Sequence, residues 1–330
     1  MNRLAQGLAG IIACSLLLCA QTPFTGRWVA QTAGPGGETQ GITYFLTQTG
    51  SSLTGAILNG YRTQRFSEGK VDGNQATWAV TTRFGDQERR VEYHARLDGD
   101  ALIIAMPAGG RGGPGGQPGA GAGPPREVTA KRVSNDGTVI GPFANLPKVT
   151  LPALHTVKDN GLGRTPPMGW NSWNRFRREV DDKTVRQIAD SVAANGMRDA
   201  GYIYINIDDT WEGERDKEGN IQGNSKFPDM KALADYVHSK GLKLGIYSSP
   251  GPKTCAGYEG SYGHELQDAR TWAKWGIDYL KYDWCSASEM YQPTDMQAVY
   301  QIMGDALRAS GRPIVFSLCQ YGQQHVETWG

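Results

Sequence analysis

Residues 242–247, LKLGIY, decide the fold of the second half of the chain, because they form an apolar run of strand length. Runs of the same kind occur at 202–207, 277–282 and 313–317, and a shorter one begins at 168. Helical patterns fill the intervals, at 183–199, 229–240, 264–275 and 294–309. Glycines mark the expected helix ends, at Gly201, Gly241, Gly276 and Gly311. Apolar strands that alternate with helices predict a parallel sheet covered by helices.

The spacing of these strands favours a barrel. Their starts lie about 36 residues apart on average, and no Gly-rich phosphate-binding turn follows any of them. This pattern is typical of an α/β fold of the (β/α)8 TIM-barrel type and not of a doubly wound sheet. Eight units of this size need about 290 residues. We therefore expect a barrel cut after its first five β/α units, at 164–330, and an exposed fifth strand that makes it unstable; a different fold is the alternative.

The first half of the chain, residues 22–134, predicts a small all-β antiparallel domain. Short alternating runs separated by turn residues are typical of a small barrel or sandwich. The runs lie at 41–46, 52–57, 76–80, 90–95, 101–104 and 126–132, with hairpin turns at 71–74 and 97–100. Nine glycines and five prolines predict a disordered loop at 107–125, and residues 135–163 read as a linker. Binding a ligand and a purely structural role both stay open for this domain.

The N-terminus indicates export. Arg3 precedes an apolar run, 8–18, which is too short to span a bilayer and matches a signal peptide at residues 1–20. The expected location is periplasmic or extracellular. A lipid anchor on Cys19 is the less favoured alternative, because Leu18 is larger than the residue that usually precedes a lipidated cysteine.

Charge and cysteine content limit the partners. A formal net charge of +1 gives no reason to expect a nucleic acid. Cys255, Cys285 and Cys319 lie outside the predicted signal peptide, and two of them can pair in an oxidising compartment. No cysteine or histidine group has zinc-ligand spacing, so we expect neither a metal nor another cofactor.

Polar residues follow the predicted strands, where a parallel barrel places its active site. In chain order they are Trp173, Asp208, Asp209, Tyr247, Lys281, Asp283 and Gln320. Carboxylates, a lysine and aromatics suit a sugar, because they bind hydroxyl groups and cover the apolar face of the ring. Lys281 and Asp283 alternate onto one face, where the lysine would lower the pKa of Asp283 and keep it ionised for nucleophilic attack. A simple salt bridge there, and helix caps for the aspartate pair, are the structural alternatives.

Six short motifs in the second half of the chain resemble those of one known enzyme family. They lie in residues 165–173, 206–211, 241–247, 253–257, 281–285 and 317–322. Their sequences and order resemble glycoside hydrolase family 27, which contains α-galactosidases and α-N-acetylgalactosaminidases. The resemblance covers residues 164–330 only.

The resemblance implies a retaining hydrolase that acts on a terminal α-galactoside by double displacement. Asp283 matches the nucleophile that attacks C1. Asp208 and Asp209 match the pair that holds the 4- and 6-hydroxyls, and Lys281 matches the lysine on the 3- and 4-hydroxyls. Trp173 matches the tryptophan that packs on the sugar, and Tyr247 matches the tyrosine near the nucleophile. The resemblance also implies a disulfide between Cys255 and Cys285 beside the substrate.

Three departures from the family pattern matter. Trp284 stands where many members have Asn or Gly, and we expect altered packing there. Gln320 stands where many have Glu, at the position that reads the C2 substituent, so galactose is less securely the substrate. No residue after Gln320 matches the family's acid/base, and Glu327 is a poor substitute, so we expect this chain as given to be inactive.

The partner that the sequence predicts is a carbohydrate that contains α-linked galactose. We expect no membrane span in the protein, and its oligomeric state stays open. A β-L-arabinopyranosidase and an α-N-acetylgalactosaminidase are alternatives within the family. A non-catalytic carbohydrate-binding protein is the alternative from another class.

Overall fold

The computed structural model describes residues 23–33, 39–84, 87–106 and 126–330. The predicted signal peptide at 1–20 and the Gly/Pro-rich loop at 107–125 lie outside these residues. The chain divides into two compact units, which we treat separately. The second unit comprises Ile57–Gln64, Thr81–Arg90 and Ile140–Gly330, and the remainder forms the first. The boundary at 139/140 lies inside the predicted linker 135–163, which contains no helix or strand.

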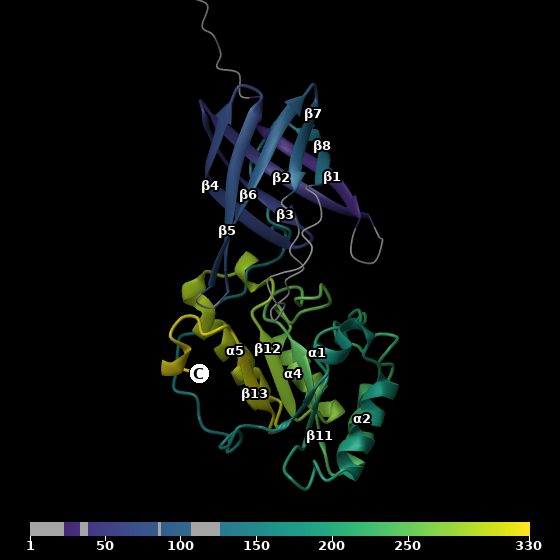
Figure 1. Cartoon of the computed structure of the whole chain (residues 1–330). Coiled ribbons are helices and arrows are strands. Elements are labelled where there is room, and N and C mark those ends of the chain that lie inside the picture. The colour runs from purple at the N-terminus through teal and green to yellow at the C-terminus, as the bar shows by residue number, and fades with distance from the viewer. Residues whose placement is uncertain (1–22, 34–38, 85–86, 107–125) are drawn as a thin grey trace, which may run out of the picture. The chain divides into compact units, whose positions relative to one another are not determined.

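The first unit is built on eight antiparallel strands that close into a barrel (Figure 1). β1 pairs with β2 on one side and with β8 on the other, where Ala30 lies opposite Ala130. The strands are β1 Gly26–Ala33, β2 Thr39–Thr49, β3 Ser52–Asn59, β4 Arg62–Asp72, β5 Gln75–Phe84, β6 Gln87–Asp98, β7 Ala101–Met106 and β8 Arg126–Ser134. The expected small antiparallel β fold is therefore present.

Hairpin turns and aromatic packing explain this barrel. The predicted turns contain Gly73 and Gly99, with φ of 58° and 57°, a region that favours glycine. Inside, Trp78 is buried and stacks on Phe66 and Tyr93 at centroid distances of 5.4 and 5.6 Å. The sequence analysis missed β1 and β4. β4 shows no hydrophobic alternation, because Phe66 and Gly69 are its only two buried residues.

The second unit contains a parallel sheet in the order β13-β12-β11-β10-β9 (Figure 1). Each strand pairs in parallel with the next along the chain, as the first five strands of a (β/α)8 barrel do. The strands are β9 Gly169–Asn171, β10 Tyr204–Asn206, β11 Lys243–Ser248, β12 Tyr279–Asp283 and β13 Val315–Cys319. The predicted fold class is confirmed by this arrangement.

Helices connect these strands. They are α1 Trp173–Phe176, α2 Asp182–Ala194, α3 Met230–Ser239, α4 Glu265–Trp275 and α5 Met296–Ala309. Single-turn 3-10 helices are η1 Arg177–Glu179, η2 Ala287–Glu289, η3 Pro293–Asp295 and η4 Val326–Thr328. None of the helices in the described part of the chain is long and apolar enough to cross a membrane.

Local signals fix the helix ends. The Asp181 side chain accepts a hydrogen bond from the Thr184 amide at 2.8 Å and caps α2, and Gly276 ends α4 in the left-handed region. The predicted helix 183–199 is too long at its C-terminal end. α2 stops at Ala194, because Gly196 adopts a φ of 87°.

Buried strands and helix faces form the core of this unit. Leu244, Ile246 and Leu280 are fully buried between the sheet and helices such as α4, which contributes Trp272. Gly245 interrupts the apolar run of β11 for a steric reason. A Cβ atom there would lie 1.9 Å from Asn206 Oδ1 on the neighbouring strand. The core therefore fixes the strand ends that carry the polar residues.

Candidate active site

The carboxyl ends of β10, β11 and β12 bring together the polar residues that the sequence singled out. Asp208 and Asp209 follow β10, Tyr247 lies near the end of β11, and Asp283 ends β12. All four side chains are buried, with exposed fractions between 1% and 5%. Buried carboxylates at the end of a barrel strand need partners, and those partners define the site.

Two tyrosine hydroxyls hold the Asp283 carboxylate. Tyr247 donates to Oδ2 at 3.0 Å, and Tyr321 donates to Oδ1 at 2.7 Å. Burial, followed by the charge of Asp283, raises the pKa of both tyrosines well above the usual value, so both stay protonated donors. The carboxylate is thus oriented on both oxygens.

Tyr321 is a site residue that the sequence analysis missed. It follows Gln320 in the loop after β13, has a φ of 63° and is 43% exposed. The motif at 317–322 was a signal that this loop reaches the site. The motif does not reveal that the Tyr321 backbone is left-handed. In this conformation the tyrosine hydroxyl reaches the Asp283 carboxylate.

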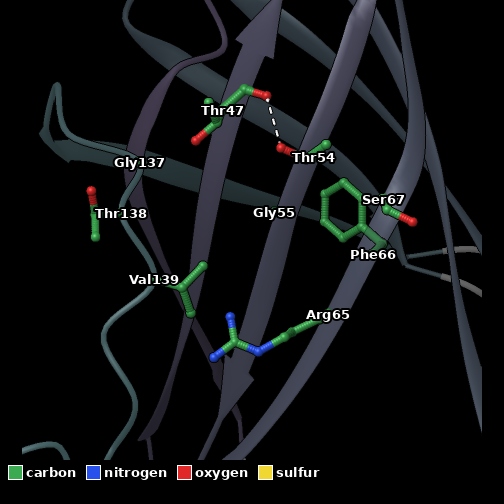
Figure 2. A pocket seen from close by; sticks show the side chains of 9 residues that line it. All are labelled: Thr47, Thr54, Gly55, Arg65, Phe66, Ser67, Gly137, Thr138 and Val139. Carbon is green, nitrogen blue, oxygen red and sulfur yellow. Dashed lines mark hydrogen bonds between the residues drawn. The ribbon is translucent and has the colours of Figure 1, made fainter.

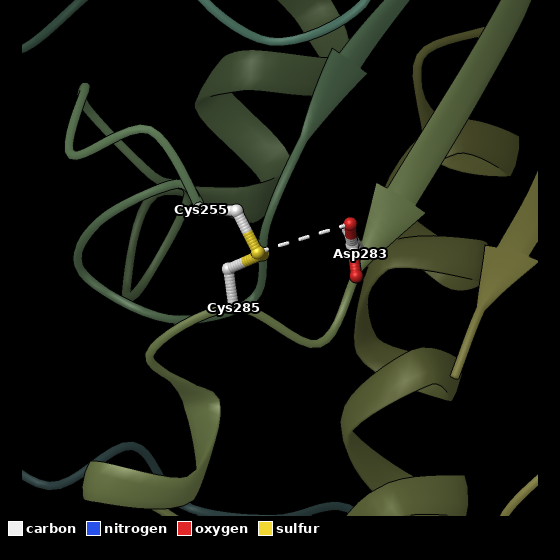
Figure 3. A group of neighbouring side chains, drawn as sticks. All are labelled: Cys255, Asp283 and Cys285. Atoms are coloured by element: carbon white, nitrogen blue, oxygen red, sulfur yellow. Dashed lines mark hydrogen bonds between the residues drawn. A yellow bond between two sulfur atoms is a disulfide. The ribbon is translucent and has the colours of Figure 1, made fainter. Parts of the chain in front are cut away.

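A disulfide joins Cys255 and Cys285 next to this carboxylate, as Figure 3 shows. The Cys255 sulfur lies 3.9 Å from Asp283 Oδ2, and the Cys285 sulfur lies 3.2 Å from the Tyr247 hydroxyl. Cys255, Cys285 and Asp283 are close enough to resemble a metal centre. However, cysteine binds metals as a thiolate, and neither disulfide sulfur is one. The described residues of this cluster therefore fit a structural disulfide beside the carboxylate better than a metal site.

Lys281 pairs with Asp208 and not with Asp283, which differs from the role suggested by strand alternation. Its Nζ lies 2.9 Å from Asp208 Oδ2 and 5.1 Å from the centre of the Tyr247 ring. Burial lowers the pKa of Lys281, but the Asp208 carboxylate outweighs burial and raises it overall. Asn171 Nδ2 donates to the same Asp208 oxygen at 2.8 Å. The charged pair offers donors and an acceptor to neighbouring hydroxyls of one ligand.

Asp209 is buried with one oxygen unpaired. The Ala256 amide donates to Oδ2 at 2.7 Å, whereas Oδ1 has no hydrogen-bond partner among the described residues. Burial raises the pKa of Asp209 to about 6, although hydrogen bonds to the carboxylate oppose the change. An unpaired acceptor at this place is suited to a ligand hydroxyl.

The remaining predicted residues lie in the adjoining loops. Trp173 begins α1 directly after β9, and its amide donates to Asn171 Oδ1 at 2.9 Å. Gln320 is buried, and its Oε1 accepts from the Gln323 amide at 2.9 Å, so it braces the loop that carries Tyr321. Trp284 stacks on Tyr300 with ring centres 5.7 Å apart.

One further cysteine and one distant acid complete the predicted set. Cys319 ends β13 and has no disulfide partner among the described residues, and burial raises the pKa of its thiol to about 12. Glu327 is a surface residue, 67% exposed, that lies 3.3 Å from His325.

Two hollows elsewhere on the two units do not include the strand-end residues. A pocket of about 430 Å³ on the first unit is lined by Arg65, Phe66 and short polar side chains, without a carboxylate (Figure 2). A larger hollow, of about 950 Å³, lies between α4, α5 and residues 149–152 of the second unit. None of the strand-end residues lines it. The carboxylate-rich strand ends are therefore the best candidate for a reactive site.

Comparison with known proteins identifies the same segment. The family model described as "Alpha galactosidase A" matches residues 165–328. An α-galactosidase A of Cellvibrio japonicus is 56% identical over 170 residues, which cover 51% of this chain and 41% of that protein. An α-galactosidase of Coffea arabica is 55% identical over 174 residues, covering 52% of this chain and 45% of that protein. This chain therefore spans less than half the length of these curated relatives.

Solved structures agree with the sequence comparison. The α-galactosidase of Saccharomyces cerevisiae aligns with a TM-score of 0.50 and 42% identity, over 52% of this chain and 38% of that one. The same yeast enzyme has been solved with raffinose. The matched region contains all the strand-end residues described above. Through residues 164–330, the chain belongs to glycoside hydrolase family 27, the family of these α-galactosidases.

Proposed function

We propose that the protein is a retaining glycoside hydrolase that releases terminal α-linked galactose, with Asp283 as the nucleophile. Its substrates would be oligosaccharides, polysaccharides or glycoconjugates. The observation that carries the proposal is the Asp283 carboxylate, buried at a barrel strand end and held on both oxygens by tyrosine hydroxyls. A carboxylate oriented in this way is ready to attack an anomeric carbon.

The reaction would proceed in two displacements. An Asp283 oxygen forms a bond to C1 while the bond from C1 to the leaving oxygen breaks, and water later releases the sugar. Tyr321 donates to one of the two oxygens, so that hydroxyl must turn away or share the oxygen as the bond forms. A retaining mechanism also needs a second carboxyl group, which protonates the leaving oxygen and then activates the water. We assign that role to no described residue.

Sugar recognition would come from the two other carboxylates. The Asp208–Lys281 pair presents an acceptor and a donor side by side, which suits two adjacent ring hydroxyls. The unpaired Oδ1 of Asp209 would accept a hydrogen bond from a further hydroxyl. Trp173 would cover the apolar face of the ring.

We further propose that the protein is exported. The Cys255–Cys285 disulfide supports this, because disulfides persist mainly in oxidising compartments. The carbohydrate substrate is the partner that the site supports.

The test compares Asp283→Asn with the wild type, each in a full-length clone that supplies the acid/base carboxylate, on α-galactosyl fluoride and on 4-nitrophenyl α-galactoside. Fluoride leaves with little help from an acid, so it isolates the nucleophile. We expect Asp283→Asn to lose at least about a thousandfold in rate on both substrates, because the covalent step is removed. Asp235→Asn, a 58% exposed aspartate on α3, is the matched control and should match the wild type.

Retained activity of Asp283→Asn would overturn the nucleophile assignment. A wild-type full-length clone that binds galactose but cleaves neither substrate would favour the carbohydrate-binding alternative. Faster cleavage of 4-nitrophenyl β-L-arabinopyranoside than of the galactoside would change the proposed substrate while keeping the mechanism.

A further inference from the structure

Glu212 is a buried acid that neither the sequence motifs nor the mechanism above uses. Its side chain is 2% exposed, and its backbone forms an isolated bridge with Gly223. Oε2 accepts a hydrogen bond from the Thr210 amide at 3.0 Å, and Oε1 has no partner among the described residues. Buried carboxyl groups with an unpaired oxygen are rare in folded proteins and call for an explanation.

The residue that Glu212 contacts has a strained backbone. Thr210 has a φ of 93°, and a β-branched residue adopts positive φ only when its surroundings impose it, at a cost of about 1–3 kcal/mol. Three side chains hold it in place. Besides Glu212 on the amide, Asn224 Nδ2 donates to the Thr210 carbonyl at 2.8 Å, and Lys226 Nζ donates to its hydroxyl at 3.2 Å.

This strained residue directly follows Asp209. Both the direction of the Asp209 carboxylate and the position of its unpaired Oδ1 depend on the peptide that joins Asp209 to Thr210. If Thr210 relaxed to a negative φ, that peptide would rotate and Asp209 would leave its bond with the Ala256 amide. Holding Thr210 therefore holds Asp209.

Glu212 has the chemistry for this task. Burial, and next the charge of Asp209, raises the pKa of Glu212 well above its usual value. A neutral carboxylic acid still accepts a hydrogen bond from an amide. Glu212 can therefore support the turn in either protonation state, and the raised pKa favours the neutral form beside Asp208 and Asp209.

We propose that Glu212 is a positioning residue, which fixes the strained Asp209–Thr210 turn and so aims the Asp209 carboxylate at a hydroxyl of the bound sugar. This inference rests on the proposed function, since it assigns Asp209 to a galactose hydroxyl. In this inference, Glu212 contributes to sugar recognition without contacting the sugar itself.

The test measures D-galactose affinity by tryptophan fluorescence, together with the melting temperature, in variants of the full chain. Glu212→Gln keeps the acceptor for the Thr210 amide and should bind within about twofold of the wild type. Glu212→Met keeps the length but lacks the acceptor, and should weaken binding at least about tenfold. Glu218→Met, at a 60% exposed surface position, is the matched control and should change neither quantity.

A double-mutant cycle separates positioning from general support of the fold. In an Asp209→Asn background, Glu212→Met should weaken binding by less than about twofold, because the group it positions is gone. In a Thr210→Gly background it should also cost less than about threefold, since glycine adopts positive φ without support. This second background also keeps the test decisive if Glu212→Met alone does not fold.

Equal losses in Glu212→Gln and Glu212→Met would overturn the inference, and so would full additivity with Asp209→Asn. A wild-type chain that does not bind galactose, or an Asp209→Asn variant that binds it normally, would instead overturn the proposed function. The two failures are therefore distinguishable.

Discussion

Replacing Asp209 by asparagine should stabilise the protein at neutral pH while it weakens sugar binding. Burial raises the pKa of Asp209 from its usual 3.8 to about 6. At about 1.4 kcal/mol per pH unit, this difference corresponds to about 3 kcal/mol. The folded state binds the proton more tightly than the unfolded chain does. The resulting stabilisation is complete below pH 3.8 and is lost as the pH rises through 6.

Asp209→Asn removes this titration, so the comparison between the variant and the wild type isolates it. Above pH 7 the variant should unfold at a higher temperature, by up to roughly 6–12 °C if 1 kcal/mol shifts the midpoint by about 2–4 °C. Near pH 4 the advantage should vanish. Thermal scans of both proteins between pH 4 and 8 provide the measurement, with Asp235→Asn as the exposed control. A variant that is less stable by the same amount at every pH would refute the reasoning.

Three other expectations follow from contacts at the site and below it. Tyr247→Phe removes one of the two tyrosine donors to Asp283 and should slow glycosylation about tenfold with little change in melting temperature. Single-turnover rates on α-galactosyl fluoride measure this effect, and an unchanged rate would contradict the orienting role of Tyr247. Replacing Cys255 and Cys285 by serine removes a disulfide that spans a sequence separation of 30, and it should lower the free energy of unfolding by about 3–4 kcal/mol. The melting temperature should fall, and reduction of the wild type should lower it equally. Asp278→Ala should destabilise the fold by about 1–3 kcal/mol, because it leaves the Leu244 amide and two partly buried charged partners unpaired, while galactose affinity of the folded fraction stays normal. Reduced affinity at full folding would show that this end of the sheet is coupled to the site.

The fold of the second unit could be predicted from the sequence because its signals are local. β11 and β12 are mostly apolar apart from Lys243, Lys281 and Asp283, since a parallel sheet is covered on both faces. The spacing of the strands implied the helices between them. β4 was missed because it contains few buried residues and so lacks the alternation that identifies a strand.

The candidate site could be predicted only in part. Asp283 and Tyr247 lie at strand ends, so the fold itself brings them together. The partner of Lys281 could not be deduced, because strand alternation places it beside Asp283 without showing that Asp208 is closer. Loop backbones set the remaining contacts. The positive φ of Thr210, on which the contact of Glu212 depends, has no sequence signal in a threonine.

The thiol of Cys319 bears on how the disulfide of this protein is kept. Thiol–disulfide exchange proceeds through attack by a thiolate, and the raised pKa of Cys319 leaves very little thiolate at neutral pH. Cys319 ends β13, the strand next to β12, and Cys285 of the disulfide lies two residues after the end of β12. Despite this position, we expect the Cys319 thiol to attack the disulfide only slowly. Among the described residues, Cys319 is therefore a poor attacking group for the Cys255–Cys285 disulfide.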